Sequence, residues 1–288
     1  MATLLDIRRK IRSIINIQQM TKAMKTVSTV KLKRAQQALL DNRAYAHRLP
    51  VLVSSIVTRV DRSLHPLLEK REEKKIELII ITSDRGLCGA FNSKIRDKAI
   101  EFIEDKREKA EIYLTLIGKK AITYFKKENF KVHFELPGIF QDLKYEKIKE
   151  IAQSLIDLFL KKEIDAIYVI YNEFRSILRH ELTVRKLIPF EEIEEEKEKA
   201  QTDYIYEPDA KTILEKLLPS YVENQLYHFL TESITSEHSA RMIAMENATN
   251  NAQELIDELI LIRNKVRQAM ITKELVNIMT TIRALEGR

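Results

Sequence analysis

Two long stretches without glycine or proline, one near each end of the chain, limit the fold more than any other feature. The first covers residues 3 to 49 and the second residues 220 to 286. In the first, apolar residues recur at steps of three and four, the period of one helix face. These residues are Leu4, Ile7, Ile11, Ile14, Ile17, Met20, Met24, Val27 and Val30. We therefore predict two unusually long helices, of roughly 70 Å and 100 Å if unbroken.

The second stretch carries an apolar stripe with the spacing of a coiled coil. Its apolar residues alternate steps of four and three. They are Leu255, Leu259, Ile262, Val266 and Ala269, with Val276 and Met279 continuing the stripe. Neither helix can bury its stripe alone. We expect the two terminal helices to wind around each other, with the middle of the chain inserted between them.

The middle of the chain alternates short β-rich runs with helical patterns. The expected strands are 76–82, 111–117, 131–136 and 166–171, and the expected helices are 91–108, 119–128 and 145–161. This alternation is typical of a parallel sheet covered on its faces. Residues 179–190 alternate with period two and predict an added antiparallel edge strand. The predicted fold class is thus a long coiled coil of the terminal helices with an inserted α/β, Rossmann-like domain.

Composition limits the domains and the compartment. We expect a coiled-coil helix in 1–60, the α/β domain in 74–200 and a second coiled-coil helix in 208–288. Hydrophobic residues make up 44% of the 288 residues, enough for a core. No apolar run reaches the length of a membrane span, and charges replace the apolar stretch of a signal peptide. The sequence predicts a protein kept inside the cell, and its single cysteine cannot form an internal disulfide.

Charge is distributed unevenly along the chain. Residues 1 to 50 contain eleven Lys and Arg against two acids, so their excess is about +9. Residues 191 to 198, "EEIEEEKE", are acidic and are interpreted as a solvated linker. We expect the basic first helix to face an acidic partner, either nucleic acid or an acidic protein surface.

The stretch "ITSDRGLCGAFNSKI", residues 81 to 95, is the best candidate for a phosphate-binding turn. It lies between a predicted strand and a predicted helix, as such turns do. However, Ala90 and Phe91 stand where a P-loop needs Lys and Ser or Thr, and only two of the three glycines of a dinucleotide site are present. The sequence therefore favours a tight turn, in which Asp84 and Arg85 pair locally or with a partner.

No residue pattern indicates catalysis, a cofactor or a metal. Cys88 has no histidine nearby in the sequence, so a packed thiol is favoured over a nucleophile. The six histidines are scattered without the spacing of a helical metal site. The basic first helix has one aromatic residue and thus no platform for stacking bases. A basic coiled-coil nucleic-acid-binding or scaffold protein remains the alternative interpretation, and a nucleotide-using α/β enzyme a further one.

Three stretches together resemble the gamma subunit of F-type ATP synthases. They are "IRSIINIQQMTKAMKTVSTVKLKRA", "SDRGLCGAFN" and "SEHSARMIAMENATNNAQELIDELILIRNKVRQAMITKEL", from the beginning, middle and end of the chain. The resemblance implies a central-stalk rotor, in which the terminal helices form an asymmetric antiparallel coiled coil. The rotor would couple ion-driven rotation of a membrane ring to conformational cycling of catalytic sites on beta subunits.

The resemblance also implies partners and contact residues. The partners would be the ring of alpha and beta subunits, the epsilon subunit and the membrane c-ring, with no nucleic acid and no cofactor. The protein would lie at the cytoplasmic face of a bacterial plasma membrane, touching the membrane only through the complex. Met24 matches a position against a beta-subunit loop, and Arg241 an arginine on the facing helix. A further group matches the contact with the catch loop of a beta subunit: Arg267, Gln268, Thr272 and Glu274. The last group matches the foot that meets epsilon and the membrane ring: Tyr204, Tyr206 and Glu207.

The chain departs from the family pattern in two places. Residues 279 to 285, "MTTIRAL", are bulkier than the small residues usual near the C-terminus of the family. We expect this bulk to affect the fit of the shaft tip. The regulatory insertion with paired cysteines found in chloroplast-type members is absent, so thiol control is not expected.

Overall fold

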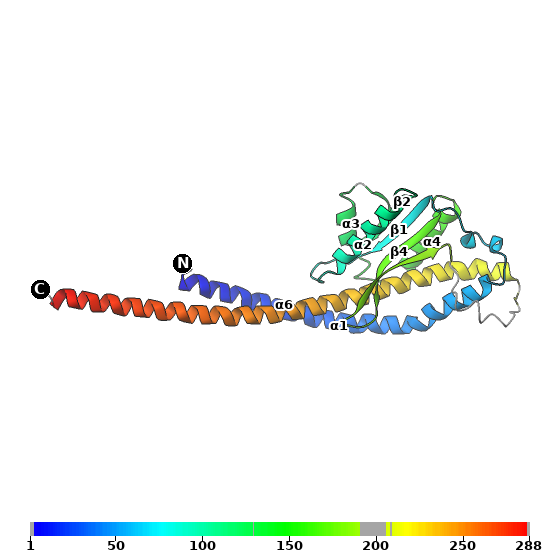
Figure 1. Ribbon diagram of the computed structural model, residues 1–288. Coiled ribbons are helices and arrows are strands. Elements are labelled where there is room, and N and C mark those ends of the chain that lie inside the picture. Colours follow the sequence, from blue (N-terminus) through cyan, green and yellow to red (C-terminus); the bar gives the residue numbers. More distant parts are fainter. Residues whose placement is uncertain (1–2, 129, 191–205, 208, 287–288) are drawn as a thin grey trace. The chain divides into compact units, whose positions relative to one another are not determined.

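The computed structural model describes residues 3–128, 130–190, 206–207 and 209–286. Two helices dominate it, α1 (Leu4–Val57) and α6 (Ala210–Glu286). The chain divides into two compact units. One contains residues 1–28 and 242–288, and the other contains residues 29–241. Each long helix therefore contributes to both units (Figure 1).

In the first unit, the start of α1 packs antiparallel to the second half of α6. Ile7, Ile11 and Ile14 are buried against Ala252, Ile256 and Leu259. The direction follows from three polar pairs: as the residue number rises on α1, it falls on α6. They are Gln18–Gln253 at 2.8 Å, Thr21–Thr249 at 2.8 Å and Lys25–Glu246 at 2.7 Å. The predicted pairing of the terminal helices is confirmed in this unit.

The seam between these helices differs from the predicted apolar stripe. Ile17, Met20 and Val27 are exposed, whereas Gln18, Thr21 and Lys25 hold the contacts with α6. On α6, Ile256 is 6% exposed, while Leu255 and Ile262 are 38% and 39% exposed. The predicted stripe is therefore wrong beyond Ile14. The contacts keep alternating steps of four and three through Gln18, Thr21 and Lys25, whereas the apolar stripe takes two successive steps of three after Ile14 and so turns away from the partner helix.

The second unit holds a five-stranded sheet of order β3-β2-β1-β4-β5. The strands are β1 (Lys75–Ile81), β2 (Glu111–Ile117), β3 (Lys131–Leu136), β4 (Ala166–Phe174) and β5 (His180–Ile188). The first four pair in parallel, and β5 adds antiparallel to β4 at the edge. The helices α2 (Phe91–Lys106), α3 (Lys119–Phe125) and α4 (Tyr145–Leu160) connect them. The parallel sheet and its antiparallel edge strand confirm the sequence prediction.

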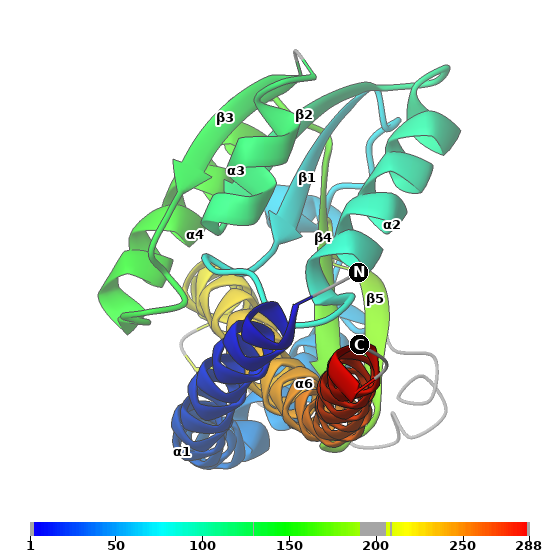
Figure 2. The same cartoon turned by 90° about the vertical axis from the view of Figure 1, so that its left-hand side faces the viewer.

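Alternate side chains of β1 enter two separate cores. Leu78 and Ile80 pack with residues of α2 and α3, which lie in front of the sheet in the view of Figure 2. Ile79 and Ile81 pack with α4 and with parts of α1 and α6 that belong to the same unit. Because both faces are covered, β1 is a continuous apolar run, as expected for a central parallel strand.

Helix α1 continues through Pro50 to Val57. A proline in a helix has no N–H and leaves the carbonyl four residues earlier without its partner. Here Gln225 supplies the missing donor: its Nε2 lies 3.0 Å from the carbonyl oxygen of Ala46. A side chain of α6 thus replaces the lost backbone bond. Among the described helices, none is long and apolar enough to cross a membrane.

Candidate partner-binding surfaces and the glycine turn

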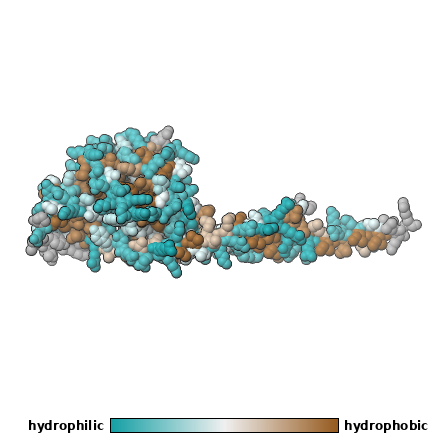
Figure 3. Space-filling view, turned by 180° about the vertical axis from the view of Figure 1, so that it is seen from behind, coloured by the Kyte–Doolittle hydropathy of each residue, from teal (hydrophilic) through white to brown (hydrophobic). Residues whose placement is uncertain are grey.

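The last part of α6 is exposed and rich in apolar side chains. Its apolar contacts with α1 involve residues up to Val266. Beyond that point the side chains are exposed to residue 283, the last one whose burial is described. The large apolar ones are Met270, Ile271, Leu275, Val276, Ile278, Met279 and Ile282. Figure 3 shows this end of α6 at the right, with brown atoms on its surface.

The sequence-predicted catch-loop residues lie in this exposed segment. Arg267, Gln268, Thr272 and Glu274 are all exposed. On a straight helix, residues 267 and 274 lie two turns apart and share one face, with residue 271 between them. Exposed Ile271 thus adds an apolar centre to this polar patch. A contact with a partner stays a prediction for these residues.

Met24 lies half-buried on α1, on the helix pair of the first unit. Its neighbour Lys25 reaches across to Glu246 of α6. Met20 and Val27, one turn to either side, are exposed. An apolar surface therefore continues outward from Met24, and the predicted partner contact at this residue stays untested.

Arg241 is buried in the second unit, with 9% of its surface exposed. Its Nη2 donates to the carbonyl oxygens of Arg85 at 3.3 Å and Gly86 at 3.2 Å. It also forms an ion pair with Glu237. Burial by itself would raise the pKa of Glu237, but hydrogen bonds from His238 and Arg241, together with their charges, lower it. In the described chain Arg241 holds the glycine turn to α6. A partner contact at this position stays a prediction.

The glycine turn itself is closed by a carboxylate. Oδ1 of Asp84 accepts the backbone N–H of Lys119 at 3.1 Å and of Gly138 at 2.9 Å. These N–H groups lie at the carboxyl edge of the parallel sheet, where doubly wound enzymes bind phosphate. Because the buried side chain of Asp84 already accepts both N–H groups, these donors are occupied at the place where a phosphate would need them. The geometry supports the predicted local pairing of Asp84.

Cys88 is packed inside the same turn. Asn92 donates from Nδ2 to its sulfur at 3.2 Å, and the same amide donates to Ser83. Burial raises the pKa of the Cys88 thiol, so the reactive thiolate is disfavoured. The prediction of a packed thiol agrees with these contacts. Among the described residues, no cluster of His, Cys, Asp and Glu is suited to hold a metal ion.

The predicted foot is described only in part. Tyr206 is half-buried and packs against the core of the second unit, while Glu207 is exposed. Tyr204 lies outside the described residues. A contact with epsilon or a membrane ring stays a prediction for all three.

A buried polar stretch of α6 was not predicted from the sequence. Between residues 223 and 241, many polar side chains are buried. Ser236 and Ser239 donate to the carbonyl oxygens of Asn172 and Ile177, at the end of β4 and in the loop that follows it. The run "TESITSEHSAR" has no Gly, no Pro and few apolar residues, which is usually typical of a solvated helix. Only the sheet beside it explains its burial.

Comparison with known proteins decides the family. The family model described as ATP synthase matches residues 3–285. The ATP synthase gamma chain of Pelotomaculum thermopropionicum is 43% identical over 99% of this chain and all of its own length. The chain belongs to the ATP synthase gamma chain family. The gamma chain of Chlorobium phaeobacteroides is also 43% identical, over the full length of both chains.

Solved structures agree with this assignment at the level of the fold. A chain of the Euglena gracilis mitochondrial ATP synthase matches with a TM-score of 0.64 and 20% identity, covering 98% of this chain and 94% of that chain. A chain of the Tetrahymena thermophila mitochondrial ATP synthase central stalk and c-ring matches with a TM-score of 0.61 and 23% identity. It covers 80% of this chain and 99% of that chain. Chains of these two ATP synthase complexes thus share this fold at low sequence identity.

Proposed function

We propose that this chain is the central rotor shaft of an F-type ATP synthase and that catalysis takes place on other subunits. Membership of the gamma chain family over essentially the whole length supports this role. A chain of the Tetrahymena central stalk and c-ring structure has a similar fold. The closed glycine turn and the buried Cys88 support a role without catalysis in this chain.

One observation carries the proposal. The helix pair of the first unit is polar along part of its seam and apolar on its outside. Gln18 and Thr21 make seam contacts, while Ile17, Met20 and Val27 are exposed. An isolated coiled coil buries its apolar residues in the seam. The reversed arrangement fits a shaft that is enclosed by other subunits along its outer surface.

The mechanism follows from the asymmetry of such a shaft. A shaft of two different helices presents a different face in each direction. The open–closed equilibria of identical catalytic sites on the surrounding subunits are therefore shifted by different amounts. Moving a site between nearly fully open and nearly fully closed needs a differential binding free energy of about 5.5 kcal/mol. Interface hydrogen bonds and ion pairs that form and break during rotation supply free energies of this order. Long helices without glycine transmit the torque.

The proposed partners are a ring of alpha and beta subunits around the shaft, with the epsilon subunit and a membrane c-ring at its foot. The eleven basic residues among the first fifty suit acidic loops of the surrounding ring. Membrane contact would occur only through the complex, at the cytoplasmic face of a bacterial membrane.

Reconstitution with the alpha and beta subunits of the same organism tests the proposal. We expect a stable complex in which ATP hydrolysis turns a bead attached to this chain, whereas the isolated chain hydrolyses no ATP. The triple substitution Ile17→Ser, Met20→Ser and Val27→Ser should leave the isolated chain folded and prevent assembly. Turnover by the isolated chain, or hydrolysis without rotation of the chain, would contradict the proposal.

A further inference from the structure

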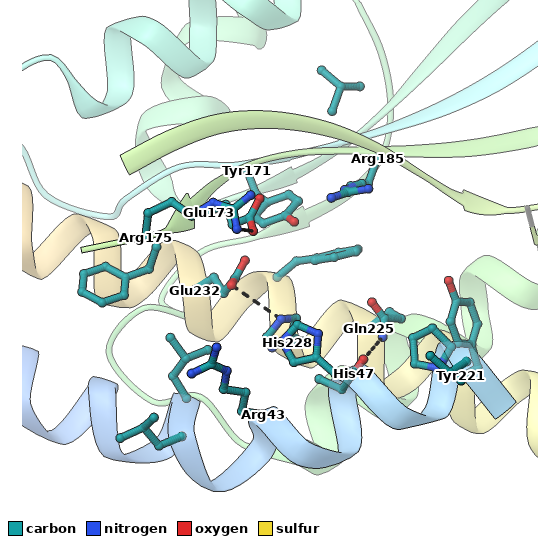
Figure 4. Close-up of a pocket in the computed structure, with 18 of the residues that line it drawn as sticks. Arg43, His47, Tyr171, Glu173, Arg175, Arg185, Tyr221, Gln225, His228 and Glu232 are labelled. Carbon is teal, nitrogen blue, oxygen red and sulfur yellow. Dashed lines mark hydrogen bonds and ion pairs between the residues drawn. The ribbon is translucent and has the colours of Figure 1, made fainter. Parts of the chain in front are cut away.

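A large cavity lies within the second unit, away from the glycine turn. Its volume is about 1130 Å³. Its walls come from three parts of the fold: α1 between residues 36 and 51, the β4–β5 edge of the sheet, and α6 between residues 221 and 232 (Figure 4). The size exceeds that of a cavity for a few waters and matches a site for a small organic molecule.

Two buried side chains at the cavity have unused hydrogen-bonding atoms. His228 and Glu232 are 8% and 7% exposed, respectively. Nε2 of His228 lies 3.5 Å from Oε1 of Glu232. Within the described part of the chain, Nδ1 of His228 and Oε2 of Glu232 have no hydrogen-bond partner. Buried polar atoms usually have one, so these atoms indicate that a ligand with polar groups completes the site.

The charges around these atoms favour an anion. Arg43 from α1 and Arg185 from β5 line the cavity, and Arg185 also hydrogen-bonds to Tyr171 of the same lining. Arg175 also lines it, paired with Glu173 at 3.1 Å. Figure 4 shows Arg43 and Arg185 on opposite sides of Glu232 and His228. Two arginines that approach one space from opposite walls are a typical setting for phosphate.

The other end of the cavity is apolar and aromatic. Phe190 and Tyr221 pack edge to face with ring centroids 5.1 Å apart, beside Pro50 and Val51 of α1. This end offers a surface for a flat ring. A charged group and an aromatic ring are therefore accommodated at different places in one cavity.

We propose that this cavity binds a nucleoside phosphate, with the phosphates between Arg43 and Arg185 and the base against Phe190 and Tyr221. His228 and Glu232 complete the hydrogen bonding of the ligand. The proposal does not depend on the rotor function, since every residue that it uses belongs to the second unit of the isolated chain.

Calorimetric titration of the isolated full chain tests the proposal with ADP, AMP, pyrophosphate and adenosine as probes. We expect ADP to bind with a Kd of roughly 10 to 100 µM, a moderate affinity, and adenosine and pyrophosphate at least tenfold more weakly. Equal affinity for pyrophosphate and ADP would overturn the proposal, as would no binding of ADP at millimolar concentration.

Matched substitutions locate the bound molecule. Arg43→Gln and Arg185→Gln should each weaken ADP binding about tenfold, the usual effect of losing one charge-assisted hydrogen bond. Arg48→Gln is the control, because Arg48 is exposed on the same helix and does not line the cavity. It should change the affinity less than twofold. Equal effects of the three substitutions would show that ADP binds elsewhere and contradict the proposal.

The pH dependence of binding provides a second test. Burial, followed by the nearby charge of Glu173, raises the pKa of Glu232 to about 8. Ionisation of Glu232 between pH 7 and pH 9 adds a negative charge to the cavity, so ADP binding should weaken several-fold over this range. The other charged or titratable residues that line the cavity with Glu232 are Arg43, His47, Tyr171, Glu173, Arg175, Arg185, Lys186, Tyr221 and His228.

Burial lowers the pKa of His228 to about 4, so His228 stays neutral. Glu232→Gln should therefore bind ADP with little pH dependence. A variant that kept the pH dependence of the wild type would contradict the assigned site.

Discussion

Two stretches of α6 depart from the usual rule that polar side chains are exposed and apolar side chains are buried, and each departs from it in a different way. Residues 223–241 are polar yet mostly buried, and residues 267–282 are rich in apolar side chains yet exposed. In the first stretch Ser236, Ser239 and Arg241 find hydrogen-bond partners in their own chain, on the sheet, in the loop after β4 and on the glycine turn. The second has its apolar surface open. The chain itself buries residues 223–241, whereas we propose that other subunits cover residues 267–282.

Of the substitutions that compare the two stretches, Arg241→Met should lower the free energy of unfolding the most. The substitution removes the Arg241 partner of the buried Glu237, which keeps only its contact with His238, and removes the Arg241 donor from the carbonyl oxygens of Arg85 and Gly86. Removing one member of a buried pair costs about 3–5 kcal/mol. We expect a loss of this size in the free energy of unfolding, measured by urea denaturation followed by circular dichroism. Arg267→Met, on the exposed stretch, is the matched control and should cost less than about 0.5 kcal/mol.

Adding Glu237→Gln to Arg241→Met separates the ion pair from the hydrogen bonds. Because the double variant has no unpaired buried charge, it should recover part of the lost stability. Equal stability of the two variants would contradict the role given to the ion pair.

A pair of identical substitutions compares apolar packing in the two stretches. Leu230 is 0% exposed and Leu275 is 57% exposed. Leu230→Ala should lower the free energy of unfolding by about 3 kcal/mol, as expected for a buried leucine. Leu275→Ala should change it by less than about 0.5 kcal/mol in the isolated chain. Similar losses for both would show that the end of α6 already packs against its own chain.

The buried polar stretch should also make stability depend on pH. The pKa of Glu232 in the folded chain, about 8, lies above the ordinary value of 4.5. Its contribution to the free energy of unfolding is thus fully present below about pH 4.5 and is lost as the pH rises through 8. We compare the free energies of unfolding of Glu232→Gln and of the wild type at pH 5 and at pH 9. Between these two values, the variant should become more stable relative to the wild type by on the order of 3 kcal/mol.

The pH dependence of Glu232 has a counterpart in His228, which lies beside it. Burial lowers the pKa of His228 below its ordinary value of 6.5, to about 4. Its contribution to stability is present above pH 6.5 and is lost as the pH falls toward 4. If the difference in free energy of unfolding between Glu232→Gln and the wild type did not change with pH above 6.5, the loss of stability at high pH could not be assigned to Glu232.

The smallest expected effect on stability is that of the double substitution Arg267→Ala and Gln268→Ala. Both side chains are exposed, so the free energy of unfolding should change by less than about 0.5 kcal/mol. In the assembled complex the same variant should weaken the coupling between ATP turnover and ion pumping. Normal coupling in reconstituted vesicles would remove this patch from the proposed contact with the ring.

The sheet was predictable because its signals are local. The run from Ile76 to Ile81 and the glycine turn that follows it identify a buried strand and its exit. The alternation in residues 180–188 identifies the edge strand β5. Such patterns depend on neighbours in the sequence, so they can be recognised without the tertiary structure.

Features that depend on distant residues were not predictable from the chain alone. Arg241 looks like a surface residue in the sequence, and its burial depends on the turn at Arg85 and Gly86. The helix through Pro50 depends on Gln225, 175 residues away in the chain. The cavity gathers residues from α1, β4, β5 and α6, so no motif reveals it.

Hydrogen exchange of α6, measured in the isolated chain and in the complex with alpha and beta subunits, tests the central claim most directly. Residues 223–241 should be protected in both states, because their own chain buries them. Residues 267–282 should exchange rapidly in the isolated chain and become protected in the complex. Protection of residues 267–282 that is the same in both states would contradict the claim that other subunits enclose the end of this shaft.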